Sequence, residues 1–226
     1  MSFASDLVSI VISLVLVMFS ATLHEVAHGY AAYKLGDPTA KMAGRLTLNP
    51  KAHLDPVGSV VLPLMMAIAG GPIFAFAKPV PYNPNNLRHP VRDEVLVALA
   101  GPVCNILQAA AGTVVVRILW FYVYPAVGAS LALTYAGYIF FFSSYVYINL
   151  VLAFFNLIPL PPLDGSAIVS PLLHGRARIK YYEIQRYAMP VLLIAMYVLP
   201  MVLPVDPVGA YLDATAGGLY DVMMGL

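Results

Sequence analysis

The residues best suited to chemistry form the sequence His24-Glu25-Val26-Ala27-His28, at the end of an apolar run. On a helix the two histidines are one turn apart and face the same way, so both imidazoles can reach one metal ion. Glu25 lies beside them, where its carboxylate could take a proton from a metal-bound water, whose pKa zinc lowers to about 7. The pattern therefore predicts a zinc site with Glu25 as catalytic acid and base.

A catalytic zinc ion usually has three protein ligands, so this site needs one more. Residues 156–165, Asn-Leu-Ile-Pro-Leu-Pro-Pro-Leu-Asp-Gly, end a long apolar run with three prolines and a glycine, which force an irregular segment. An aspartate before a glycine is more often a turn former than a ligand. Its Pro-rich setting at a membrane boundary makes Asp164 the candidate for the third ligand.

The alternative interpretation of the first motif is a polar helix end that is solvated at the membrane interface. If the helix continues to Lys34, His28 lies about 9 Å below that lysine along the helix axis. Three ionisable side chains in five residues are costly at membrane depth, and a buried glutamate there would need a partner. The depth of the motif therefore favours a functional site.

The composition indicates a protein that uses lipid as its solvent. Of the 226 residues, 61% are hydrophobic and 10% are charged, whereas about 25% of the residues in soluble domains are charged. The net charge of +1 argues against nucleic acid as a partner, because binding to phosphates needs a basic face. With Cys104 as the single cysteine, neither an intramolecular disulfide nor a Cys-rich zinc knuckle can form.

The apolar runs predict an all-α membrane protein with about four transmembrane helices. A helix needs about 20 mostly apolar residues to cross a bilayer, and the uncharged stretches near that length are 7–23, 56–77, 95–116 and 187–205. A longer run, 118–163, should contain the end of one helix, a turn near 125–128 and a span that ends near Asn156. We expect one membrane-embedded domain, 1–226, with its core at 7–165 and an accessory span at about 187–205.

The stretch 56–77 is rich in proline and glycine, which favours a re-entrant or irregular segment over a full span. With re-entry, the acidic N- and C-terminal segments fall on one side of the membrane. The other side then receives the basic residues Lys34, Lys41, Arg45, Lys51, Lys78, Arg88, Arg92, Arg176, Arg178, Lys180 and Arg186. The positive-inside rule then predicts a multi-pass protein of the cell membrane with both termini outside and the active site toward the cytoplasm.

Two segments, 41–49 and 78–83, lack helical periodicity and could form short membrane-associated β-strands. A protease must unwind a helical substrate before it can reach a peptide bond. An exposed strand edge could capture the unwound segment by β-addition.

Three motifs occur in an order that resembles the intramembrane site-2 protease family of zinc metalloproteases: 24–28, Gly-Pro-Val-Cys-Asn at 101–105, and 156–165. The segments 36–38, 44–50 and 77–80 are most similar to compact bacterial-type members without a PDZ domain. The resemblance implies Zn²⁺ held by His24, His28 and Asp164, with Glu25 as the catalytic residue. It also implies that a transmembrane protein substrate is cut in the bilayer, often in regulated signalling.

Several other polar residues are candidates for accessory roles. Asn156 could bind the substrate backbone or stabilise an oxyanion, and we favour that role over an interhelical hydrogen bond. For Asn149 the interhelical bond is favoured, and Asn105 is as compatible with a structural role as with a functional one. His53 could form a pair with Asp55 close to the metal or belong to an alternative ligand set, although an interfacial histidine is the favoured interpretation.

The sequence thus predicts a zinc metalloendopeptidase of the HExxH type that cuts within or near a transmembrane segment. The alternative is a non-catalytic metal-binding protein or a divalent-metal transporter. A transporter needs a polar path to both faces, but the apolar spans contain an acidic residue only at Glu25. A pseudoenzyme would normally have lost that glutamate.

Overall fold

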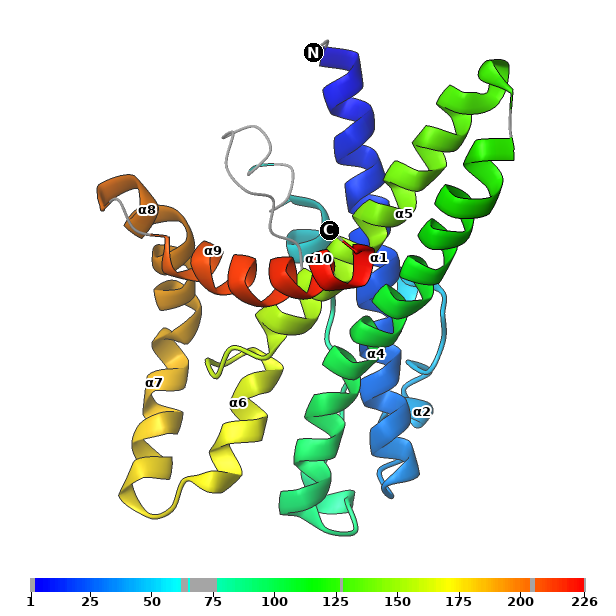
Figure 1. Ribbon diagram of the computed structural model, residues 1–226. Coiled ribbons are helices and arrows are strands. Elements are labelled where there is room, and N and C mark those ends of the chain that lie inside the picture. The colour runs from blue at the N-terminus through cyan, green and yellow to red at the C-terminus, as the bar shows by residue number, and fades with distance from the viewer. Residues whose placement is uncertain (1–2, 62–64, 66–76, 127, 204–205, 226) are drawn as a thin grey trace.

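The computed structural model describes residues 3–61, 65, 77–126, 128–203 and 206–225 (Figure 1). These residues form helices and connecting segments, and no β-strand occurs among them. Three helices are long and apolar enough to cross a membrane, and a fourth candidate is a pair of helices bent by 110°. The three are Ile10–Lys34, Pro90–Ala126 and Leu131–Asn156, and the pair is Pro190–Val202 with Pro207–Met224. The predicted all-α membrane architecture is confirmed.

Helix α1 (Phe3–Lys34) carries the first motif well inside its length, as the sequence predicted. The helix ends at Lys34, and the turn that follows contains Gly36, whose φ of 117° is a conformation that side chains disfavour, and then Pro38. The buried Asp37 then ties this end of α1 to the η3 turn (Pro84–Asn86), because its carboxylate accepts hydrogen bonds from the Asn83 backbone N–H and the Asn86 side chain.

Burial raises the pKa of the Asp37 carboxyl. Hydrogen bonds from Thr39, Asn86 and Asn83 lower this pKa by more than burial raises it, so the net pKa is below its usual value. The carboxylate is therefore charged in the folded protein and acts as a buried acceptor that links the two connecting segments.

Helices α4 (Pro90–Ile118) and α5 (Ala129–Asn156) form an antiparallel pair that packs against α1 (Figure 1). Pro90 begins α4 at the position where a missing N–H costs least. The turns η4 (Leu119–Val123) and η5 (Tyr124–Ala126) end this span, and α5 stops at Asn156 before the Pro-rich segment. The predicted turn near 125–128 and the predicted end at Asn156 are both confirmed.

The C-terminal part of the chain differs from the expected span at about 187–205. Helix α7 (Arg176–Leu193) begins eleven residues earlier and continues through η7 (Ile194–Val198) into α8 (Leu199–Val202). The chain then turns back, and α9, η8 and α10 lie across α5 and α4 (Figure 1). Their bounds are Pro207–Leu212, Asp213–Gly217 and Gly218–Met224, respectively.

The returning segment is anchored by packing and by a cap. Ala216 is fully buried in a core with Ala109, Val146 and Leu150. Arg117, near the end of α4, donates from Nε and Nη2 to the Met223 carbonyl at 3.2 and 2.9 Å. A cation at the C-terminal end of a helix is favourable, so Arg117 has a structural partner there.

Between α1 and α4 the chain forms α2 (Thr39–Met42), η1 (Pro50–Ala52) and η2 (Pro56–Val61). The β-strands predicted at 41–49 and 78–83 are absent, although the structure describes every residue of both segments. The physical reason is the choice of partners: the Val80 and Asn83 N–H groups bond to side chains of α1 and its connection, so no strand ladder forms. The re-entrant prediction for 56–77 falls mostly on residues outside those that the structure describes.

The basic connections lie together, as the charge pattern predicted. The C-terminal end of α1, the N-terminal end of α4 and the connection between α6 (Asp164–Val169) and α7 lie at the same end of the molecule (Figure 1). This arrangement brings the two principal motifs to one membrane side.

Candidate metal centre

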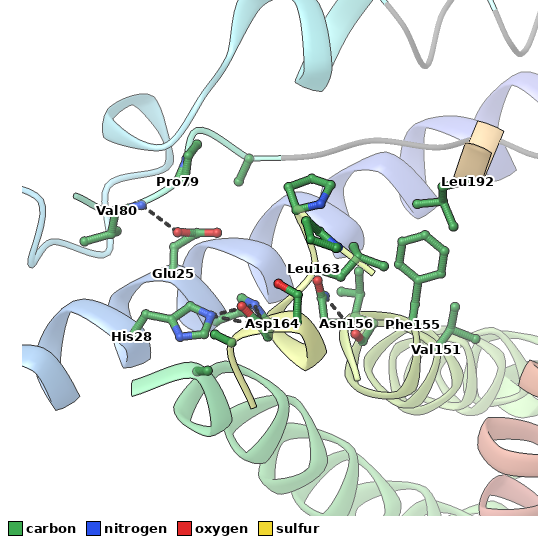
Figure 2. A pocket seen from close by; sticks show the side chains of 18 of the residues that line it. Glu25, His28, Pro79, Val80, Val151, Phe155, Asn156, Leu163, Asp164 and Leu192 are labelled. Carbon is green, nitrogen blue, oxygen red and sulfur yellow. Dashed lines mark hydrogen bonds and ion pairs between the residues drawn. The ribbon is translucent and has the colours of Figure 1, made fainter. Parts of the chain in front are cut away.

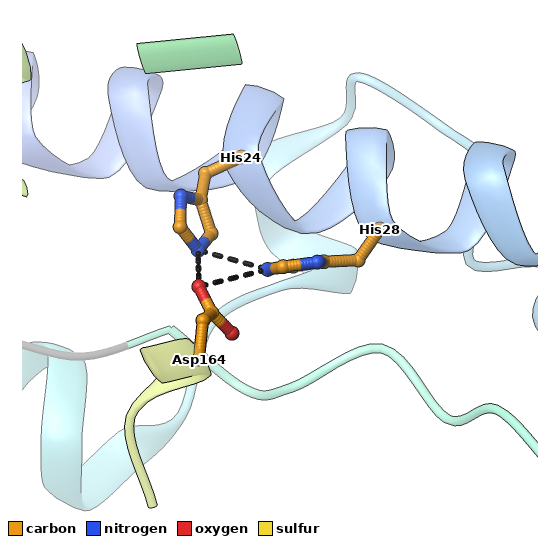
Figure 3. Close-up of side chains that lie close together, drawn as sticks. All are labelled: His24, His28 and Asp164. Atoms are coloured by element: carbon orange, nitrogen blue, oxygen red, sulfur yellow. Dashed lines mark hydrogen bonds and ion pairs between the residues drawn. The ribbon is translucent and has the colours of Figure 1, made fainter. Parts of the chain in front are cut away.

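Three side chains from distant parts of the chain converge beside α1 (Figure 3). His24 and His28 project one turn apart, with 3.0 Å between their Nε2 atoms. Asp164 is the first residue of α6, and its Oδ2 lies 3.2 Å from His24 Nε2 and 3.3 Å from His28 Nε2. Among the described residues, these three form the only group of histidine, cysteine and acidic side chains placed to hold a metal ion.

The other nitrogen of each imidazole is held by α4. His28 Nδ1 lies 2.7 Å from the Val97 carbonyl oxygen. Because a carbonyl only accepts, this nitrogen carries the proton and the Nε2 atom presents its lone pair to the site.

The same tautomer follows for His24 from a chain of buried amides. Asn149 Nδ2 donates to the Tyr145 carbonyl, which fixes the orientation of that amide, and its Oδ1 accepts from Asn105 Nδ2 at 2.8 Å. Asn105 therefore turns its Oδ1 toward His24 Nδ1, 2.5 Å away, and accepts its proton. Ser20 completes the chain as a second acceptor for Asn149, at 2.9 Å.

The geometry suits a zinc ion. When both imidazoles are neutral with the proton on Nδ1, two Nε2 lone pairs and one carboxylate oxygen face each other, which is the donor set that zinc takes. Asp164 Oδ2 is also buried and has no hydrogen-bond donor among the described residues. Zinc–ligand bonds of about 2.0–2.1 Å at tetrahedral angles place ligand atoms roughly 3.3 Å apart, close to the observed separations of 3.0, 3.2 and 3.3 Å.

One face of α4 forms the wall behind the site. Val97, Gly101 and Asn105 are four residues apart and therefore align along this face. A Cβ atom on Gly101 would lie 2.6 Å from His24 Nε2 and would also meet the His28 ring, so only glycine fits there. The close approach of the histidine rings explains the glycine of the 101–105 motif, and the hydrogen bond to His24 explains its asparagine.

Glu25 lies on the cavity side of α1, and its Oε2 accepts a hydrogen bond from the Val80 N–H at 2.7 Å (Figure 2). The bond uses one acceptor position and leaves the carboxylate at the cavity wall beside the three converging side chains. A base held by a backbone donor has a fixed orientation, which suits proton transfer to and from a bound water.

The cavity beside these residues has a volume of about 990 Å³. Its wall is mainly apolar and includes Val151, Phe155, Leu163 and Leu192, which come from α5, α7 and the Pro-rich segment. Asn156 lines the cavity beside Asp164 (Figure 2), although its Nδ2 donates to the Leu152 carbonyl of its own helix at 2.9 Å. An apolar chain segment of several residues fits such a space.

The remaining polar residues that the sequence singled out, Asn105, Asn149 and His53, have different surroundings. Asn105 contacts His24, and Asn149 makes the predicted interhelical hydrogen bond. His53 is fully buried, its Nε2 lies 2.9 Å from the Thr47 carbonyl, and it is not part of the converging group. The acceptor role of Val97 was missed, because a backbone carbonyl leaves no mark in a sequence.

Comparisons with known proteins define the class of the chain. The family model described as Peptidase family M50 matches residues 123–199. A Bacillus subtilis protein named "Putative zinc metalloprotease YwhC" is 40% identical over 193 residues, which are 85% of this chain and 79% of that protein. No solved structure matches significantly.

Two mycobacterial relatives are more distant, and both are named "Putative zinc metalloprotease Rip2". The Mycobacterium tuberculosis protein is 27% identical over 78% of this chain and 63% of its own length. The Mycolicibacterium smegmatis protein is 28% identical over 70% of this chain and 55% of its own length.

The helices and the comparisons together define a multi-pass membrane protein of the zinc metalloprotease class. The chain belongs to peptidase family M50, which is zinc-dependent, and the predicted resemblance to site-2 proteases is confirmed.

Proposed function

We propose that this chain is an intramembrane zinc endopeptidase that cuts a peptide bond within or near a transmembrane segment of another protein. In this proposal His24, His28 and Asp164 hold the metal, and Glu25 is the catalytic acid and base. The observation that carries it is the convergence of two imidazole Nε2 atoms and one carboxylate oxygen, separated by 3.0–3.3 Å, at the wall of an apolar cavity.

A bound zinc ion supplies a Lewis acid that polarises water and the peptide carbonyl. The chain's own residues move the proton. Glu25, held through Oε2 by the Val80 N–H, takes a proton from the attacking water and returns it to the leaving amine. Asn156 lies at the cavity wall beside Asp164, where its amide can bind the substrate backbone or the developing oxyanion.

The location of the cavity supports a membrane-embedded substrate. His28 lies six residues before Lys34 on a continuous helix, which is about 9 Å along the axis. The basic connections lie at this end of the molecule, so the positive-inside rule orients the site toward the cytoplasmic side. The resemblance to site-2 proteases supports a role in regulated proteolysis of membrane-anchored proteins.

The proposal is tested with purified wild type and Glu25→Gln in liposomes that contain a panel of single-span test proteins with a tag at each end. Both proteins should hold about one zinc per chain, because Glu25 is not a ligand, and only the wild type should separate the tags. Glu183→Gln is the matched control, since this exposed glutamate lies on α7 away from the cavity lining. Cleavage that persists in Glu25→Gln would contradict its role. A zinc-loaded wild type that cuts no test protein would contradict the proposed substrate class.

A further inference from the structure

A third carboxylate besides Glu25 and Asp164 lines the active-site cavity. Glu94 lies on α4, one turn before Val97, whose carbonyl holds His28. Three residues of helix correspond to about 4.5 Å along the axis, so Glu94 is close to the site on the side of the basic connections. Nothing in the proposed chemistry uses this side chain.

Glu94 lacks a cationic partner in the part of the chain that the structure describes. The described residues of the cavity lining include no lysine or arginine, and the neighbouring Arg92 pairs with Asp93 at 2.9 Å. The contact recorded for Glu94 is the Tyr82 hydroxyl, 3.4 Å from Oε1, which is long for a hydrogen bond. The carboxylate therefore retains acceptor capacity toward the cavity.

The charge balance of the cavity makes Glu94 an uncompensated anion. With zinc bound, two neutral histidines and Asp164 leave a formal charge of about +1, which the Glu25 carboxylate cancels. One negative charge remains at Glu94. A cationic group in the cavity would complete the balance, whereas an anionic one would be repelled.

Membrane substrates supply such a cation at this depth. Cytoplasmic ends of transmembrane segments are enriched in lysine and arginine, whose long side chains extend along apolar surface toward the interface. A substrate strand covers about 3.3 Å per residue, so a basic residue a few positions from the cut would reach the region of Glu94.

We propose that Glu94 is a specificity-determining residue that receives a lysine or arginine flanking the cut segment of the substrate. This inference rests on the proposed function. The alternative is a hydrated glutamate near the N-terminal end of α4, where the helix dipole favours a negative charge without any ligand.

The test measures binding of three synthetic peptides to the purified protein in detergent by fluorescence anisotropy. The peptides share one apolar 20-residue segment and carry lysine, glutamine or glutamate at the cytoplasmic flank. N-methylated peptide bonds in the apolar segment prevent cleavage without changing the charges of the cavity, and Glu94→Gln, Glu94→Lys and Glu183→Gln are compared with the wild type. Without a change at position 94, the lysine peptide should bind about fivefold tighter than the glutamine peptide, the upper end for a partly exposed ion pair.

Glu94→Gln should reduce this preference to less than about twofold, and Glu94→Lys should shift it toward the glutamate peptide. Glu183→Gln should leave it unchanged. Equal binding of the three peptides, no binding of any, or a lysine preference that survives Glu94→Gln would overturn the inference. Cleavage of the same segments with unmodified peptide bonds tests the proposed function separately, because charge-selective binding without cleavage would refute only that function.

Discussion

Replacing Asn105 by leucine removes the acceptor behind His24 while preserving the branching of the side chain at Cγ. His24 is 6% exposed, so its Nδ1–H would be left buried without a partner, at a cost of about 1–3 kcal/mol. The tautomer that avoids this cost places the proton on Nε2, where the metal must bind. Loss of such a supporting hydrogen bond typically lowers metal affinity 10- to 100-fold, or about 1.4–2.7 kcal/mol. This range overlaps the cost of about 1–3 kcal/mol for leaving the Nδ1–H without a partner.

The assay is zinc affinity, measured by competition with a chromophoric chelator in detergent-purified protein. Asn105→Asp should retain affinity better than Asn105→Leu, because a carboxylate also accepts from His24 Nδ1. Asn149→Leu is the matched control: it breaks the same chain of amides one residue further from the metal, so stability should fall more than affinity.

Two results would refute this reasoning. One is an Asn105→Leu protein that folds with zinc affinity within twofold of the wild type. The other is an equal loss of affinity in the Asn105→Leu and Asn149→Leu variants, which would indicate general damage to the packing of α1, α4 and α5.

Gly101→Ala should lower zinc affinity at least about tenfold because the new Cβ would meet both histidine rings. The control is Gly137→Ala on α5, which has open space around it and should leave zinc affinity unchanged. The same competition assay compares the two variants. Asp37→Asn should lower the melting temperature at pH 7 by turning an N–H toward the Asn83 N–H. Because the pKa of Asp37 is lowered in the folded state, its stabilisation is complete above the ordinary value of about 4 and is lost as pH falls through the lowered pKa. The melting temperatures of wild type and variant should therefore differ by a constant amount above about pH 4 and begin to converge as the pH falls below it, and a gap that does not narrow in acid would argue against the charge of Asp37 as the cause. Removal of zinc with a chelator should lower the melting temperature of the wild type more than that of Asp164→Ala, because only tightly bound metal stabilises the folded state.

The pairing of His24 with His28 could be predicted because helical periodicity alone places both side chains on one face. The end of α5 at Asn156 could also be predicted, since three prolines in seven residues end a helix. Asp164 could be chosen as third ligand only through the topology that brought it to the same membrane side. The structure supplies the distances that a sequence cannot contain.

Other parts of the site depend on interactions without a sequence signature. The Val97 carbonyl and the Val80 N–H hold His28 and Glu25 through the backbone, which every residue possesses. The predicted strand at 78–83 was wrong because its backbone donors bond to side chains of distant residues rather than to a neighbouring strand. The return of α9–α10 over α5 follows from packing of small residues such as Ala216, which hydropathy does not distinguish from a terminal tail.

The central claim is that one zinc ion joins the two motifs, and zinc content per chain tests it most directly. Wild type, Asp164→Ala and the exposed control Asp213→Ala are purified in detergent with zinc supplied and then dialysed against metal-free buffer. Wild type and Asp213→Ala should hold about one zinc per chain, and Asp164→Ala should lose most of it, because two histidines alone are too few ligands. Full zinc retention in Asp164→Ala, or an absence of zinc in all three proteins, would contradict the account.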